Sequence, residues 1–185
     1  MIENLFALEK PKVEPKTVDS IKEIKFAGPW TTKSDAQLIV LFKFGVDQVR
    51  DQLDYDESEL KYIPEDFDIR GLRGYTIRNL KKGKIGGTEF HRIRKEMVLG
   101  LDGLIEWECE DVYKNKRKFI LNNKTGVYMP PFILHTYKTT EDGGLFVLAN
   151  TLFNPEDPRT HDTYTTEVFR KLQEQYDKWI KSKLI

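Results

Sequence analysis

From Ile69 to Thr151 the chain is a succession of short apolar runs, rich in β-branched and aromatic residues, and this pattern constrains the fold most strongly. Eight of these runs are predicted strands: Gly74–Asn79, Glu89–Ile93, Met97–Leu101, Leu104–Glu110, Lys118–Leu121, Gly126–Met129, Phe132–Lys138 and Leu145–Thr151. Strands that follow one another so closely, with no helix between them, are typical of a jelly roll or a small barrel. We therefore predict an all-β fold.

Turn residues separate the predicted strands. Asp102-Gly103 lies between two apolar runs and predicts a type I′ hairpin turn, which requires positive φ at both central positions. Asn122-Asn123-Lys124 and Glu141-Asp142-Gly143-Gly144 predict further turns, because Asn, Asp and Gly accept the conformations that turns demand. Each of these segments is expected to end one strand and begin the next.

The segment before the strands differs in composition and is predicted to form an N-terminal extension over residues 1–68. Its charged arm, Lys10–Lys25, contains two prolines and too little apolar surface to fold alone, so it either docks or stays mobile. One strand is expected over Gln37–Phe44. The acid-rich insertion that follows is expected to begin with a short helix over Asp47–Leu53.

Near the C-terminus, apolar residues recur at spacings of one, three and four, which places them on one face of a helix. They are Val168, Phe169, Leu172, Tyr176, Trp179 and Ile180. Such a face must cover either the flank of the barrel or a partner subunit. The predicted organisation is an extension over 1–68, a barrel core over 69–165 and a C-terminal helix over 166–185 that packs on the barrel.

Composition excludes several classes of protein. Lys and Arg together number 30, as do Asp and Glu, which disfavours a globally basic nucleic-acid-binding protein. The single cysteine, Cys109, rules out an internal disulfide framework. No apolar segment approaches the roughly 18 to 20 residues of a membrane span, and the N-terminus lacks a signal-peptide pattern. We expect a cytoplasmic protein with no nucleic-acid or membrane partner.

A few residues in the β-rich segment are suited to acid–base chemistry. Glu89 and His91 are two apart, so on a strand they point to the same face. Eight Lys and Arg residues and one acid occur from Arg73 to Lys95, a local positive field that suits an anionic ligand. The same alternation predicts that Arg92 and Arg94 face away from His91.

Two sets of residues resemble known motifs by their order and spacing. Glu89, His91, Glu96 and Gly103 resemble the first motif of the cupin superfamily, and Gly126, Pro130 and His135 resemble the second. A closer resemblance, over about residues 69–169, is to the nucleotide-sugar 3,4-ketoisomerases, the WxcM-like cupins. The matching segments are Arg73-Gly-Tyr75, Gly87-Thr-Glu89-Phe-His91, Leu101-Asp-Gly103, Gly126-Val-Tyr128, Pro130 to His135 and Val147-Leu-Ala149. Glu89 stands where that family has the first of two histidines.

The resemblance implies a cupin-type jelly-roll β-barrel with an N-terminal extension and a C-terminal α-helix. It implies an isomerase of carbohydrate biosynthesis that moves a carbonyl between C4 and C3 of a dTDP-4-keto-6-deoxyhexose, without a metal or other cofactor, as a homodimer. The catalytic residues would be His91 as the base, Glu89 as its partner and Tyr75, which can hydrogen-bond an enolate oxygen. Arg73, Tyr128 and His135 would bind the substrate.

Two other functions remain open at this point. Glu89, His91, Glu96 and His135 form a nitrogen and oxygen ligand set for Zn, Mn or Fe(II), which would make the protein a metal-dependent cupin enzyme. Alternatively, the loss of the first histidine would leave a non-catalytic cupin that binds a sugar nucleotide or another carbohydrate.

Overall fold

Antiparallel strands form most of the fold in the part of the chain that a computed structural model describes, which is residues 8–46, 54–55, 60 and 69–182. The strands are β1 (Lys22–Lys25), β2 (Ala27–Thr31), β3 (Gln37–Val40), β4 (Arg70–Leu80), β5 (Ile85–Phe90), β6 (Glu96–Glu110), β7 (Lys116–Leu121), β8 (Thr125–Met129), β9 (Leu134–Thr151) and β10 (Tyr164–Thr165). One long helix, α3 (Thr166–Ser182), follows them. The helix predicted over Asp47–Leu53 lies outside the described residues.

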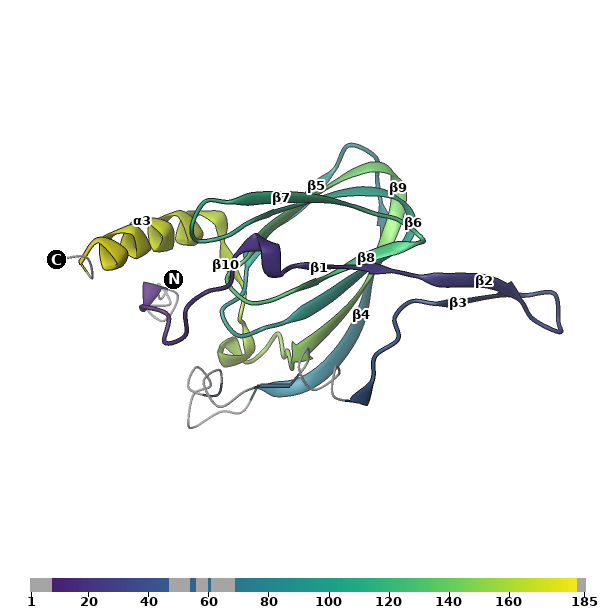
Figure 1. The fold of residues 1–185 in the computed structure, drawn as a ribbon, viewed down its shortest axis with the longest axis horizontal. Helices are drawn as coiled ribbons and strands as arrows, with labels where there is room; N and C mark the ends of the chain where they lie inside the picture. Colours follow the sequence, from purple (N-terminus) through teal and green to yellow (C-terminus); the bar gives the residue numbers. More distant parts are fainter. Residues whose placement is uncertain (1–7, 47–53, 56–59, 61–68, 183–185) are drawn as a thin grey trace.

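The two longest strands, β6 and β9, organise an eight-stranded sheet that folds into two halves (Figure 1). In one half, the start of β9 lies between β5 and the end of β6, and β7 continues the ladder beyond β6. In the other half, the end of β9 lies between β4 and the start of β6, and β8 and β1 continue it. The ladder of the described strands is not closed into a ring, and the arrangement is the predicted cupin-type jelly roll.

The hairpin predicted at Asp102-Gly103 and the turn predicted at Glu141–Gly144 are both wrong. Strands β6 and β9 continue through these positions without a break. The two positions lie opposite each other: Asp102 pairs with Gly144, and the register shifts on either side of this pair. Gly103 has φ +70°, and a Cβ there would lie 2.3 Å from the Asp142 carbonyl oxygen. The turn-forming residues therefore serve a β-bulge, where both strands bend from one half of the sheet to the other.

The main hydrophobic core lies between the two halves. The half that contains β5 and β7 contributes Trp107 and Phe119, and the other half contributes Val98 and Val147, all buried. Cys109 is buried in the same core, and this burial raises the pKa of its thiol to about 12, so it stays protonated. Inward-facing positions of this core also supply the functional site described below.

Helix α3 extends from the end of the molecule opposite the β2–β3 ribbon (Figure 1), and its first turns pack beside β5. Its buried residues Phe169, Leu172 and Tyr176 pack in one cluster with Phe90 of β5 and with Phe132, as the amphipathic pattern predicts. Arg170 forms an ion pair with Glu110 at the end of β6. No described helix, α3 included, is long and apolar enough to cross a membrane.

The N-terminal segment is more structured than its sequence predicts. The arm docks: Val18 and Ile21 are buried in the main core, and β1 pairs with β8. Instead of one strand, the described part of the segment contains three, and the strand predicted over Gln37–Phe44 ends at Val40. Strands β2 and β3 pair with each other in a separate two-stranded ribbon that projects from the body (Figure 1).

The bulge predicts a difference between two glycine substitutions. Gly83 also has positive φ, +82°, but no heavy atom lies within 4 Å of a Cβ placed on it. Gly83→Ala should therefore lower the free energy of unfolding by about 1 kcal/mol, the cost of positive φ alone. Gly103→Ala should cost about 2 kcal/mol more because the added methyl meets backbone. Urea denaturation of both variants measures the difference, and equal costs would show that the strands do not approach closely at Gly103.

Candidate functional site

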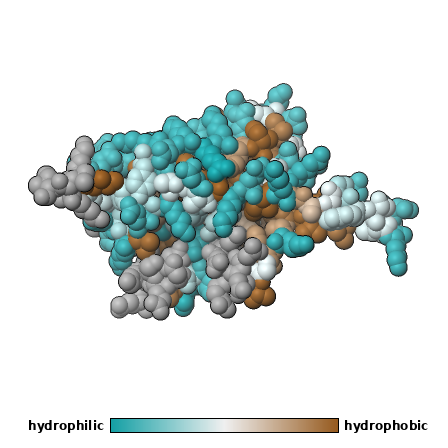
Figure 2. All heavy atoms as spheres, in the orientation of Figure 1, coloured by the Kyte–Doolittle hydropathy of each residue, from teal (hydrophilic) through white to brown (hydrophobic). Residues whose placement is uncertain are grey.

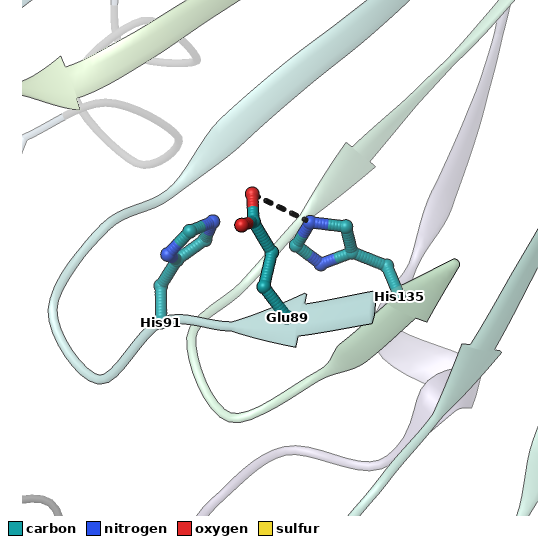
Figure 3. A group of neighbouring side chains, drawn as sticks. All are labelled: Glu89, His91 and His135. Atoms are coloured by element: carbon teal, nitrogen blue, oxygen red, sulfur yellow. Dashed lines mark ion pairs between the residues drawn. The ribbon is translucent and has the colours of Figure 1, made fainter. Parts of the chain in front are cut away.

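The structure brings three of the predicted site residues together from separate parts of the chain. Glu89 comes from β5, His91 directly follows β5, and His135 comes from β9, where it is the cross-strand partner of Glu89. One ligand atom of each lies within 4.8 Å of the others, and all three side chains point to the same side of the sheet (Figure 3). His91 and His135 are buried, whereas the Glu89 side chain is 37% exposed and lies at the open side of the group.

Asp162 fixes the segment that contains His91. Its carboxylate accepts hydrogen bonds from the backbone N–H groups of Arg92, Ile93 and Arg94 at 2.9, 2.8 and 2.7 Å. The main-chain carbonyl oxygen of Asp162 lies 2.5 Å from His91 Nδ1. Because a carbonyl oxygen only accepts, Nδ1 carries the proton and Nε2 is left as the basic nitrogen.

Glu96 lies next to this basic nitrogen, and the carboxylate is completely enclosed. Its Oε2 is 3.5 Å from His91 Nε2, and its Oε1 accepts from Arg94 at 3.2 Å and from the Tyr75 hydroxyl at 3.4 Å. Burial alone would raise the pKa of Glu96, but the neighbouring His91 and Arg94 hold that pKa well below its usual range. Glu96 therefore stays ionised and can stabilise a proton on His91.

His135 is held as a neutral imidazole. Its Nδ1 donates to the Ile133 carbonyl at 3.2 Å, so its Nε2 faces Glu89 Oε1 at 3.9 Å. The indole of Trp107 stacks on the ring with centroids 5.2 Å apart and planes at 11°. Burial lowers the pKa of His135 to about 4, and the neighbouring His91 acts in the same direction. His135 therefore offers a lone pair rather than a proton at neutral pH.

A cavity of about 370 Å³ adjoins these residues, and we call it the arginine cavity. It is lined by Arg73, Tyr75, Arg94, Phe153 and Thr163. The Arg73 guanidinium lies 5.1 Å from the ring centroids of both Tyr75 and Phe153. Burial and the nearby Arg94 lower the pKa of Arg73, and its buried Nε has no hydrogen-bond partner among the described residues. A cavity lined by two arginines and two aromatic rings is suited to an anionic or aromatic ligand.

The expectation that Arg94 faces away from His91 is wrong. Strand β5 ends at Phe90, so the alternation that predicts the orientation of Arg94 does not extend to it. The chain instead wraps around Asp162, which turns Arg94 inward, and its Nη1 lies 3.4 Å from His91 Nε2. Arg92 does face away: its guanidinium donates to the Glu9 carbonyl at 3.0 Å.

Tyr128 is not brought to this group. It is on β8, its ring is approached by Lys22 of β1 at 5.9 Å, and it lines a separate cavity beside β1. Conversely, the site contains Asp162 and Thr163, which no motif in the sequence marks. The segment between β9 and β10 that contains them carries no periodic pattern, so only the three-dimensional structure places them here.

Glu89, His91 and His135 offer the ligand atoms of a metal centre, and the hydrogen bonds of both histidines suit that role. Metal-binding histidines usually donate their other ring N–H to a carbonyl or carboxylate, and both histidines do so here. Two imidazole nitrogens and one carboxylate suit Fe(II), Mn or Zn. Glu96, the fourth ligand that the sequence suggests, is instead paired with Arg94 and lies outside the group.

A jelly roll with a histidine and carboxylate site on its inner face defines a cupin. The family model described as FdtA, WxcM-like C-terminal, matches residues 34–168, and the chain belongs to this family. The match begins earlier than the segment over 69–169 that the motifs indicate.

Solved structures of ketoisomerases share the fold. QdtA, a sugar 3,4-ketoisomerase from Thermoanaerobacterium thermosaccharolyticum in complex with TDP, superposes with a TM-score of 0.57 at 18% identity, covering 87% of this chain and 98% of that one. WlaRA, a TDP-fucose-3,4-ketoisomerase from Campylobacter jejuni, gives 0.54 at 23% identity, with coverages of 83% and 96%. A 3,4-ketoisomerase from Helicobacter canadensis gives 0.55 at 20% identity, with coverages of 84% and 96%. No curated protein matches the chain significantly in sequence.

The low pKa of His135 predicts how stability depends on pH. Between the usual histidine pKa of 6.5 and about 4, the unfolded chain takes up a proton at His135 that the folded chain does not. The free energy of unfolding should therefore fall by about 2 kcal/mol from pH 7 to pH 5. Urea titrations of wild type and His135→Gln measure this dependence, which the substitution should flatten. Equal slopes would show that His135 titrates normally in the fold.

Proposed function

We propose that the chain is a nucleotide-sugar 3,4-ketoisomerase that acts on a dTDP-4-keto-6-deoxyhexose. Membership of the WxcM-like family and the fold shared with three sugar ketoisomerases support this substrate class. The observation that carries the proposal is the environment of His91, whose Nδ1–H is fixed by the Asp162 carbonyl while Nε2 faces Glu89, Glu96 and His135. A base held in this way is suited to proton transfer at a carbon next to a ketone.

The reaction begins at C3 of the sugar, whose proton is acidified by the C4 carbonyl. His91 Nε2 takes this proton, the C–H electron pair becomes the C3–C4 double bond, and the carbonyl π pair moves to the C4 oxygen. The proton on His91 passes through Glu89 to C4 of the resulting enediolate, where the C3–C4 π pair forms the new C–H bond. The proton of the C3 hydroxyl moves to the C4 oxygen, and the O–H electron pair that it leaves forms the C3 carbonyl. The C3 ketone is then complete, and the sum of atoms and electrons is unchanged. Glu96 stabilises the imidazolium that forms at His91.

The remaining residues divide between proton transfer and binding. Glu89 is the exposed member of the group and occupies the position of the family's first histidine, so it is the group that delivers the proton to C4. Tyr75 lies against Arg73 in the arginine cavity, where its neutral phenol can orient the sugar. Burial and the Glu96 carboxylate raise the pKa of Tyr75, which keeps the phenol protonated. Arg73 binds the diphosphate, and His135 completes the wall beside Glu89.

His91→Asn separates the base from the binding site. Asparagine keeps a donor and a similar shape but cannot accept a proton, so exchange at C3 should fall on the order of a hundred- to ten-thousand-fold. Binding of the nucleotide sugar should stay within a few-fold of wild type. Deuterium entry from heavy water into a dTDP-4-keto-6-deoxyhexose measures exchange, and calorimetry measures binding. Glu89→Gln should reduce conversion to the 3-keto product as much as His91→Asn, while C3 exchange continues.

Two results would contradict the proposal. Wild-type protein that binds the nucleotide sugar without exchanging deuterium would be a non-catalytic sugar-nucleotide-binding cupin. Wild-type protein that neither binds nor exchanges would share only the fold of the ketoisomerases.

A metal-dependent cupin enzyme is the second candidate, and the geometry of Glu89, His91 and His135 favours it specifically. Such a metal would supply Lewis-acid chemistry at the same place. The ketoisomerase proposal predicts less than a tenth of an equivalent of Zn, Mn or Fe in the purified protein and activity that survives chelation. Elemental analysis before and after chelation measures this. About one equivalent of metal, lost together with activity, would establish the second candidate, and Glu89→Gln should then abolish metal binding.

We also propose that the protein is a cytoplasmic homodimer that works in carbohydrate biosynthesis, as the family resemblance implies. The projecting β2–β3 ribbon supports a second copy of the chain as partner. Trp30 and Leu38 on the ribbon are 51% and 47% exposed, and Figure 2 shows apolar surface around the base of the ribbon. Exposed apolar side chains on a ribbon whose two strands pair with no other described strand favour association.

A further inference from the structure

Arg94 is an almost completely enclosed cation at the wall of the arginine cavity, with 5% of its surface exposed. Its Nε donates to Thr151 Oγ1 at 3.2 Å, its Nη1 to Glu96 Oε1 at 3.2 Å and its Nη2 to Thr163 Oγ1 at 3.3 Å. These partners come from the end of β9, the start of β6 and the segment before β10. A guanidinium held from three directions is preorganised, so it need not reorient when charge develops beside it.

The hydrogen-bond count leaves Arg94 with a donor to spare. A guanidinium has five N–H groups. The contacts of Arg94 with described residues account for four: one each to Thr151, Glu96 and Thr163, and one from Nη1 toward His91 Nε2 at 3.4 Å. The fifth N–H, on Nη2, is therefore available to a ligand in the arginine cavity.

The charges around the cavity also favour an anion within it. Arg73 and Arg94 both line the cavity, and Glu96 is the carboxylate that pairs with Arg94. No ion pair joins Arg73 to a carboxylate among the described residues, and its buried Nε has no partner there. Two guanidinium groups and one paired carboxylate give this wall of the cavity a net positive charge. If Arg73 binds the diphosphate, Arg94 is available to a second negative group of the substrate.

We propose that Arg94 is a catalytic residue that donates a hydrogen bond to the C4 oxygen and neutralises it as the enediolate forms. This role rests on the proposed ketoisomerase function. When C3 is in reach of His91 Nε2, the C4 oxygen is only two bonds from that carbon. The Arg94 guanidinium, whose Nη1 lies 3.4 Å from the same nitrogen, then has its spare Nη2 N–H for this oxygen. The electron pair leaves the C3–H bond for the C3–C4 bond, and the carbonyl π pair comes to rest on the oxygen that Arg94 contacts.

Tyr75 is the competing donor for this oxygen, and it is the weaker of the two. Its hydroxyl is directed at Glu96 Oε1 at 3.4 Å, and a neutral phenol carries no charge to offset the enediolate. Hydrogen bonds from a charged donor are about twice as strong as neutral ones. Arg94 therefore supplies what a transition state with a full negative charge requires.

Arg94→Gln tests this role in the full-length protein. Loss of one oxyanion donor typically reduces kcat on the order of a hundred- to a thousand-fold. We expect such a fall in deuterium entry at C3, with dTDP binding within a few-fold of wild type by calorimetry. Arg78→Gln is the matched control, because Arg78 is an exposed arginine on the same strand as Arg73 and should leave both values unchanged. Circular dichroism checks that each variant is folded.

Chemical rescue distinguishes catalysis from a structural role. Guanidinium at millimolar concentration should restore exchange at least tenfold in Arg94→Ala and have no such effect on wild type. If Arg94→Gln is unfolded, Arg94→Lys replaces it in the test. Lysine keeps the charge but not the planar set of N–H donors, so exchange at C3 should fall at least tenfold. Exchange near wild type in either folded variant, or a loss that guanidinium does not rescue, would overturn the role of Arg94 while the isomerase function stands. Wild type without exchange would overturn both.

Discussion

The hydrogen bonds of Asp162 are the interaction on which the rest of the site depends. Strand β5 ends at Phe90 and β6 begins at Glu96, so the intervening residues have no ladder to define them. The Asp162 carboxylate takes three consecutive backbone N–H groups of this segment, and its carbonyl takes the His91 side chain. Hydrogen bonds to a charged acceptor are each worth about 1.5 to 3 kcal/mol, which is enough to hold a short segment in one conformation. Both His91 and Arg94 owe their orientation to this one residue.

Asp162 in turn is positioned by the outer layer of the molecule. It lies just before β10, which pairs with β5, and β10 leads directly into α3. Phe90 directly precedes His91. Phe169 of α3 packs against Phe90, with ring centroids 4.9 Å apart. The apolar packing on the outer face of β5 and the site on its inner face are therefore joined through two adjacent residues, Phe90 at the end of β5 and His91 directly after it.

The sequence predicts the fold class and half of the site, for physical reasons that differ. The β-rich core and the C-terminal helix could be predicted because short apolar runs and apolar residues at helical spacing are local features of the sequence. Glu89, His91 and His135 could be predicted as site residues because their spacing in the sequence matches the family motifs. The hairpin prediction at Asp102-Gly103 is wrong because glycine with positive φ suits a β-bulge as well as a hairpin turn. Only the strand with which this segment pairs, here β9, distinguishes the two structures.

The role of Asp162 and the inward orientation of Arg94 could not be predicted from the sequence. The contact between Asp162 and His91 joins residues 71 positions apart, and no periodicity connects them. The orientation of Arg94 follows from that contact, since a period of two applies only while a strand lasts. Residues that depend on long-range hydrogen bonds of an irregular segment could not be predicted from local patterns.

The central claim is that Asp162 leaves His91 with a basic Nε2 that faces Glu96 and Arg94. The most direct test is ¹⁵N NMR of the imidazole in wild-type protein, at a pH where His91 is neutral. Coupling of the ring proton to Nδ1, with Nε2 unprotonated, is the result that the structure predicts. A neutral ring with its proton on Nε2 would contradict the account, because that nitrogen could then not accept a proton from the sugar.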